Sequence, residues 1–183
     1  MRVVDFIFLI GWAAFWLTWL VAATGAKAGR GGLTRYAGVR VAVALLILLV
    51  LRLHAFKGHR VTTTDPLLQG IGLALFVLGL GLALWARFYL GRNWGMPMTQ
   101  KADPELVRTG PYRTIRHPIY SGIILAMVGT GLAVNLYWLI ALVVVGPYFI
   151  WSALVEERNM TRVFPDAYPD YKHSTKMLVP FVF

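Results

Sequence analysis

The fold is decided by an uncharged run, Pro118–Val155, which reads PIYSGIILAMVGTGLAVNLYWLIALVVVGPYFIWSALV. One membrane crossing needs about 20 predominantly apolar residues, so this run is long enough for two crossings. Only Asn135 and its immediate neighbours interrupt the apolar pattern. We therefore predict transmembrane helices at Pro118–Val134 and Leu136–Val155, joined in a tight helical hairpin.

Three more apolar runs precede this hairpin, at Phe6–Ala23, Tyr36–Leu53 and Pro66–Leu90. Hydrophobic residues make up 58% of the chain and charged residues 14%, against roughly 25% in soluble domains. The predicted fold is all-α, a single integral membrane domain over residues 1–183 with five transmembrane helices. The first run could be a cleaved signal peptide, but it exceeds the usual length of about 7–15 residues and carries Asp5, so we predict a retained helix.

The distribution of basic residues predicts how the chain is oriented in the membrane. The net charge of +10 could indicate nucleic acid, but the basic residues lie in short segments between the apolar runs. Basic residues in such places set topology and meet anionic head groups, so no nucleic-acid partner is expected. The predicted orientation has a cytoplasmic C-terminus and an external N-terminus. All 18 Lys and Arg residues would then lie on the cytoplasmic side except Arg2, Arg52, Lys57 and Arg60.

Small residues and tryptophans within the predicted spans each allow two interpretations. The glycines indicate either close helix packing or room for a lipid chain. The tryptophans share one face of the first helix and indicate a packing or lipid-facing stripe rather than a cofactor box. The chain has no cysteine and its histidines are scattered, so no metal site is predicted. The glycines are Gly70, Gly72, Gly79, Gly81, Gly122, Gly129 and Gly131, the tryptophans are Trp12, Trp16 and Trp19, and the scattered histidines are His54, His59 and His173.

A polar, turn-rich segment, Asp103–Gly122, runs directly into the fourth predicted span and reads DPELVRTGPYRTIRHPIYSG. Pro118 fits the first turn of that helix, which places His117 at its N-terminus. Free backbone N–H groups at such an end favour an anion. The segment therefore indicates either an anion pocket at the membrane boundary or a basic anchor for lipid head groups. Nearby polar side chains are Arg113, Arg116, Tyr120 and Ser121.

The C-terminal tail, residues 156–183, combines aromatics, prolines and charges. It begins with Glu156-Glu157-Arg158 at the end of the fifth span. A disordered tail would not need so many aromatic residues. We expect a short amphipathic helix and an extended segment that fold back over the hairpin and exclude water.

Several of these motifs together resemble a known enzyme family over about Leu106–Phe183. Their combination is similar to isoprenylcysteine carboxyl methyltransferases and the related phospholipid N-methyltransferases. The arrangement RHPxYxG alone also occurs in sterol reductases that use NADPH. Because the chain is compact, it resembles a prokaryotic-type member, expected in the cell membrane. The motifs are Gly110-Pro111-Tyr112, Arg116-His117-Pro118, Tyr120, Gly122, Glu156-Glu157, Tyr168, Tyr171 and Pro180.

The resemblance implies that S-adenosylmethionine binds between the hairpin and the tail. Two sets of residues follow from matching positions. The cofactor would be lined by Val107, Gly110, Tyr112, His117, Pro118, Tyr120 and Glu156. Nearer the reacting groups would be Glu157, Arg158 and Arg116. Which of the two glutamates contacts the cofactor stays open at this point.

The implied activity is methyl transfer to a lipophilic acceptor at the cytoplasmic membrane boundary. The expected acceptor is the carboxylate of an isoprenoid or prenylcysteine-like compound. A carboxylate needs no base and could be held by an arginine, whereas an amine or thiol would need Glu157 or His117 as a base. The alternatives are a phospholipid amine or thiol methyltransferase, an NADPH-dependent reductase of the sterol-reductase type, and a non-enzymatic membrane scaffold. The sequence leaves the acceptor and the oligomeric state open.

Overall fold

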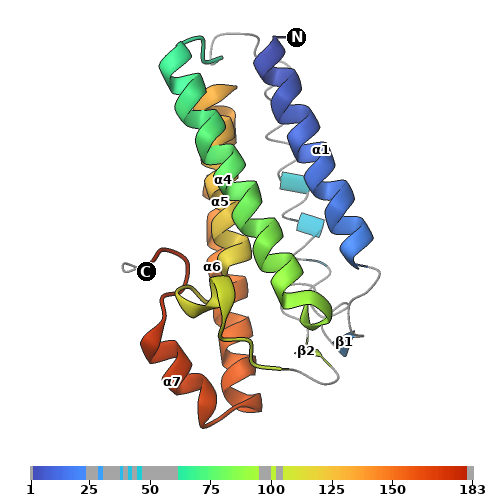
Figure 1. Cartoon of the computed structure of the whole chain (residues 1–183), viewed down its shortest axis with the longest axis vertical. Coiled ribbons are helices and arrows are strands. Elements are labelled where there is room, and N and C mark those ends of the chain that lie inside the picture. Colours follow the sequence, from blue (N-terminus) through green and yellow to red (C-terminus); the bar gives the residue numbers. More distant parts are fainter. Residues whose placement is uncertain are drawn as a thin grey trace.

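The computed structural model describes residues 2–23, 29–30, 62–94, 100–101 and 105–180, with a few positions between 38 and 46. Its helices pack lengthwise, and α7 lies at the end of the bundle away from the N-terminus (Figure 1). The predicted second span, Tyr36–Leu53, falls almost wholly outside the described residues. The α-helices are α1 (Val3–Ala23), α4 (Pro66–Leu90), α5 (Pro118–Ala133), α6 (Tyr137–Val163) and α7 (Ala167–Ser174).

Among the residues that the structure describes, three helical stretches are long and apolar enough to cross a membrane: Val3–Ala22, Pro66–Asn93 and Tyr137–Val163. The helix α5 is apolar but shorter, with 16 residues. The chain is therefore a helical integral membrane protein, as its composition indicates, and the count of five spans stays a prediction. Within the described residues, a short two-stranded sheet departs from the all-α prediction, in which β1 (Gly29–Arg30) pairs antiparallel with β2 (Gln100–Lys101).

Local signals in the sequence set the helix ends. The side chain of Asp65 caps α4 by accepting from the N–H groups of Leu67 and Leu68, at 2.8 and 3.2 Å. At the other end of α4, Gly91 has φ of 52°, a left-handed conformation that favours glycine. The helix α6 continues eight residues past the predicted span limit of Val155, to Val163. Glu156 and Glu157 therefore lie on a rigid helix.

The helices α4 and α5 cross in backbone contact. A Cβ atom placed on Gly79 would lie 2.5 Å from the backbone N of Ala126, and one on Gly122 would lie 2.5 Å from the carbonyl O of Gly79. Gly72 and Gly129 face each other in the same way one level further along. For these four glycines, close packing is the correct interpretation. The helix α5 is therefore packed closely on α4, and it also contacts α6.

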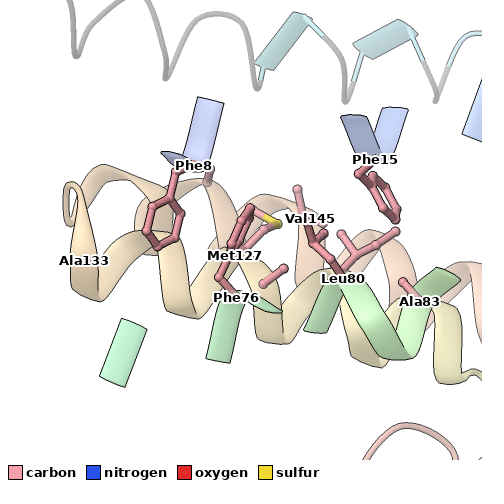
Figure 2. Packing of buried hydrophobic residues seen from close by; sticks show 11 residues of the cluster. Phe8, Phe15, Phe76, Leu80, Ala83, Met127, Ala133 and Val145 are labelled. Atoms are coloured by element: carbon pink, nitrogen blue, oxygen red, sulfur yellow. The ribbon is translucent and has the colours of Figure 1, made fainter. Parts of the chain in front are cut away.

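Aromatic side chains of α1 fill the space over the α4–α5 pair. Figure 2 shows Phe8 and Phe15 reaching toward the cluster that contains Phe76 of α4, and the Phe8 and Phe76 ring centroids are 4.4 Å apart. Trp12 stacks on Trp138 of α6 at 5.7 Å. Trp16, by contrast, is 49% exposed. The tryptophan face of α1 is therefore a packing surface with a lipid-facing edge.

Arg87 is buried in an aromatic slot at the end of α4 rather than exposed in the following loop. Its guanidinium lies 4.5 Å from the centroid of Trp94, and its side chain is 2% exposed. It donates hydrogen bonds to the carbonyls of Ala22, in the last turn of α1, and Gly91. A cation at a helix C-terminus interacts favourably with the helix dipole. Arg87 thus fastens α1 to α4.

Candidate functional site

The candidate site is built where the tail returns to the start of α5. The N–H groups of Arg116 and His117 donate to the carbonyls of Lys176 and Met177, at 2.8 and 3.1 Å. The N–H of Lys176 donates to Thr114 O at 3.1 Å. These two N–H groups, at and just before the N-cap of α5, are used by tail carbonyls, and the predicted anion site at the first turn of α5 stays a prediction.

Glu157 is the buried centre of the site, with 2% of its surface exposed. Its Oε1 accepts from Arg116 Nε at 2.6 Å, and its Oε2 lies 2.8 Å from Lys172 Nζ on α7. Arg116 also donates through Nη1 to the carbonyl of Thr175 at 2.5 Å. Two cations therefore share one carboxylate, which favours its ionised form. The arrangement ties α5, α6 and the tail together.

Glu156 faces a different set of groups. Its Oε1 accepts from Tyr120 OH at 2.6 Å and from Ser152 Oγ at 3.3 Å. Its Oε2 lies 3.6 Å from Nδ1 of His117, and its side chain is 28% exposed. This carboxylate is therefore reachable, unlike that of Glu157.

The imidazole of His117 lies between the two glutamates. Its Nε2 is 3.5 Å from Glu157 Oε1 and makes no hydrogen bond with the described part of the chain. The side chain is only 9% exposed. A buried polar atom without a partner costs free energy and calls for an explanation, such as a ligand or a catalytic role.

An aromatic stack leads from this imidazole into the bundle. The rings of His117 and Tyr120 are nearly parallel with centroids 5.5 Å apart, and Tyr120 stacks on Phe149 of α6 at 4.5 Å. Tyr120 and Ser152 are both buried. These stacked rings form a continuous aromatic surface, which we call the dry wall, between the polar site and the apolar part of α6.

The segment before α5 is anchored on α4 through the 3-10 helix η3 (Gly110–Arg113). Gly110 has φ of 58°, and a Cβ there would lie 2.6 Å from the ring of Tyr89. Tyr112 OH donates to Ala86 O at 3.3 Å, and Tyr171 OH donates to Tyr112 O at 2.7 Å. Burial raises the pKa of Tyr112 and of Tyr171, so both hydroxyls stay neutral donors.

The structure gathers only part of the predicted residue set. One cluster holds Arg116, His117, Pro118, Tyr120, Glu156 and Glu157. Arg158 is exposed, and Val107 is half-buried on the segment that leads to η3. Sequence reasoning missed Ser152, although it lies four residues before Glu156 and therefore on the same helix face. It also missed the role of Lys172, for which the sequence has no local signal.

The cluster suits an organic ligand with cationic and hydroxyl groups. Glu156 offers a partly exposed carboxylate, the hydroxyls of Tyr120 and Ser152 lie beside it, and His117 offers an unpaired ring nitrogen. Among the described residues, no three metal-binding side chains gather in one place. The chemistry of the site is therefore that of carboxylates, hydroxyls and an imidazole beside an apolar bundle.

Comparison with known proteins finds relatives that match between 63% and 81% of the chain. The chain is 26% identical, over 81% of its length, to the nickel-cobalt-cadmium resistance protein NccN of Alcaligenes xylosoxydans xylosoxydans, covering 66% of that protein. It is 28% identical over 63% of its length to a methanethiol S-methyltransferase from a Pseudomonas species, covering 48% of it. It is 31% identical over 63% of its length to protein-S-isoprenylcysteine O-methyltransferase B of Arabidopsis thaliana, covering 60% of it.

The chain thus spans about half to two thirds of the length of these relatives. The family model described as phospholipid methyltransferase matches residues 68–167, which is more than half of the chain. That match includes most of α4, all of α5 and α6, and both glutamates of the site. The methyltransferase resemblance seen in the sequence is confirmed, and the chain belongs to the phospholipid methyltransferase family.

Proposed function

We propose that the chain is an S-adenosylmethionine-dependent methyltransferase that acts on a lipophilic acceptor at the cytoplasmic membrane boundary. The family supports methyl transfer, and two relatives are named as methyltransferases. The observation that carries the proposal is the partly exposed Glu156, held by Tyr120 and Ser152 next to the unpaired nitrogen of His117. Such a cluster at the end of apolar helices suits a polar donor and a lipid-soluble acceptor.

The residues present fit the donor. S-adenosylmethionine, when bound, supplies an activated methyl group on a sulfonium and also carries an ammonium group and ribose hydroxyls. We assign Glu156 to its cationic or hydroxyl groups and His117 to a hydrogen bond through Nε2. Tyr120 would keep the glutamate oriented, because its hydroxyl is already 2.6 Å from Oε1. The other proposed lining residues are Val107, Gly110, Tyr112 and Pro118.

Glu157 and Arg116 have a supporting role in this proposal. Arg116 already uses Nε and Nη1 for Glu157 and the tail carbonyls, so its main work is to hold the tail. Glu157 is neutralised by Arg116 and Lys172 and is a poor base. Arg158 is exposed and lies outside this cluster, so its contact with a carboxylate of the acceptor stays a prediction from the sequence.

A carboxylate of an isoprenoid or prenylcysteine-like compound is the acceptor we favour. It is already ionised, and its charge is lost as the new bond forms, which a site shielded from water does not oppose. The dry wall of Tyr120 and Phe149 provides such shielding. If the acceptor is a thiol or an amine, His117 is the proposed base, because its ring lies between Glu156 and Glu157 and its Nε2 makes no hydrogen bond with the described residues.

The proposed orientation places α7 and the candidate site on the cytoplasmic side and the N-terminus outside. The support is the concentration of basic residues in the segments around the site. We propose that the chain crosses the membrane five times, with Tyr36–Leu53 as the second span. The tail would cover the bound donor. Reaction with a membrane-impermeant reagent at cysteines placed singly at Thr63 and Lys176 would test it, since only the first should react from outside.

Donor binding is the direct test of the proposed function. Isothermal titration of the purified full chain in detergent should show binding of S-adenosylmethionine and none of NADPH. We expect Glu156→Gln and His117→Ala to weaken donor binding at least about tenfold, the equivalent of about 1.4 kcal/mol. Asp166→Asn, an exposed carboxylate before α7, is the matched control and should bind as the wild type does. Binding of NADPH instead, or of neither ligand, would contradict the proposal.

A further inference from the structure

A basic depression lies beside the candidate site, between the end of α6, α7 and the returning tail. Its volume is about 590 Å³. Four of its lining side chains are basic or can become so, and among the described residues that line it none is acidic. Pro169 and Met177 add apolar surface. The basic members are Arg116, Lys172, His173 and Lys176.

Positive charge is in excess in this depression. Arg116 and Lys172 share the single carboxylate of Glu157, which lies beneath them at 2.6 and 2.8 Å. Lys176 is a third cation, and its side chain is exposed. Three cations against one carboxylate leave a net charge of +2 on these four groups. Like charges at close range repel, and an anion in the depression would relieve that repulsion.

The depth of the depression matches a lipid head group. Thr161, which lines it, is six residues past Val155, where the apolar part of α6 ends. At 1.5 Å per residue this places it about 9 Å beyond the apolar region. The head-group layer on each side of a bilayer is about 5–8 Å thick. The depression therefore lies at or just outside the phosphates of the surrounding lipids.

We infer that this basic depression binds the phosphate group of an anionic phospholipid. Lys176 faces the phosphate from the returning tail and His173 faces it from α7, while Lys172 is shared between the phosphate and Glu157. The apolar surface of Pro169 and Met177 contacts the glycerol and the first carbons of the chains. This site goes beyond the proposed methyl transfer and does not depend on it, because the lipid binds as a ligand and not as the acceptor. A free phosphate has the same charge but lacks the apolar part.

Lipid binding to the purified full chain in non-ionic detergent tests this inference. Thermophoresis with a fluorescent phosphatidylglycerol should show tighter binding than with a fluorescent phosphatidylcholine. Lys176→Gln should weaken phosphatidylglycerol binding about fivefold, the effect of one basic residue near an anionic surface. The matched control is Arg162→Gln, which removes an equal charge from the last turn of α6, outside the depression. It should change the affinity less than twofold.

Two results would overturn the inference. Equal losses in Lys176→Gln and Arg162→Gln would mean that overall charge, and not this depression, attracts the lipid. Displacement of the lipid by inorganic phosphate at similar concentrations would mean that the site takes a free anion. Both variants leave Glu157 and its partners intact, so donor binding measured in the same samples reports separately on the proposed methyltransferase.

Discussion

Two arginine–carboxylate pairs with the same 2.6 Å separation lie at opposite ends of α5. At the C-terminal end, Arg2 binds Asp5 and also donates to the carbonyls of Thr63 and Val134. Its charges balance one to one, and the side chains are 32% and 25% exposed. At the N-terminal end, Arg116 and Glu157 are 7% and 2% exposed, and Lys172 adds a second cation.

The two ion pairs differ in role: the Arg2–Asp5 pair holds helices together, whereas the Arg116–Glu157 pair belongs to the candidate site. The Arg2 end balances its charges and joins the start of α1 to Thr63, before α4, and to Val134, at the end of α5. The Glu157 end is more deeply buried, places two cations on one carboxylate and holds an imidazole nitrogen that makes no hydrogen bond with the described residues. Native proteins leave few buried polar groups unpaired, and the exceptions gather where ligands bind or chemistry occurs. The same ion-pair distance therefore has a different meaning at each end.

The largest expected effect is that of removing Glu157. Glu157→Ala leaves the buried Arg116 without its carboxylate, and breaking a buried pair typically costs about 3–5 kcal/mol. Asp5→Ala breaks a pair of equal length in a wetter place, where the cost is about 0–1 kcal/mol. Thermal unfolding in detergent should show a much lower midpoint for the first variant. Similar midpoints would remove the distinction between the two ends.

A second effect concerns the backbone contact where α4 and α5 cross, between the two ends of α5. Gly79→Ala places a methyl group 2.5 Å from the backbone of Ala126, and such overpacking costs about 1–3 kcal/mol. Gly81→Ala, on the same helix, meets nothing within 4 Å. It should be neutral or stabilise the helix by up to about 1 kcal/mol. A stability loss in Gly81→Ala as large as in Gly79→Ala would contradict the backbone contact.

A smaller effect is expected at the Arg2 end. Asn135 is 3% exposed and lies just before Leu136, the N-cap of α6, and its Oδ1 accepts from the N–H of Tyr137 at 2.9 Å. Loss of this hydrogen bond in Asn135→Ala costs about 0.5–1.5 kcal/mol. Donor binding, titrated at a temperature where the variant is folded, should equal that of the wild type. A loss of donor affinity would show that this end also serves the site.

Much of the helical part of the fold could be predicted from the sequence, because local signals define it. Asp65 and Pro66 begin α4 and Gly91 ends it, so the predicted bounds Pro66–Leu90 match the structure. Pro118 likewise fixes the start of α5. Hydropathy did not predict the end of α6, because the apolar stretch stops at Val155 whereas the helix continues beyond it. Polar helix formers carry that helix on to Val163.

The candidate site was predictable only in part. Tyr120 and Glu156 meet because each lies on the inner face of a helix of the same pair, next to His117. Contacts made by the tail depend on its path through space, so no spacing in the sequence predicts that Lys172 reaches Glu157. For the same reason, the sequence could not show that the donors of Arg116 are already used by tail carbonyls.

The smallest effect we predict tests the hydrogen bond from Tyr171 to the carbonyl of Tyr112. Tyr171→Phe removes the donor and leaves a buried acceptor unpaired, at a cost of about 0.5–1.5 kcal/mol near neutral pH. Tyr168→Phe is the matched control on the same helix, because that tyrosine is equally buried but its hydroxyl makes no hydrogen bond with the described residues. Chemical unfolding in detergent at pH 7 should separate the two variants.

The stability difference between the wild type and Tyr171→Phe should also depend on pH. Burial raises the pKa of Tyr171 above the usual value of 10.0, so the folded protein keeps the hydroxyl neutral while the unfolded chain ionises. The stability of the wild type is then complete below pH 10 and falls as the pH rises beyond it. Tyr171→Phe lacks this ionisable group, so its stability should fall less steeply above pH 10. Its deficit relative to the wild type should therefore shrink and then reverse, whereas parallel curves would mean that Tyr171 is not buried at the tail contact.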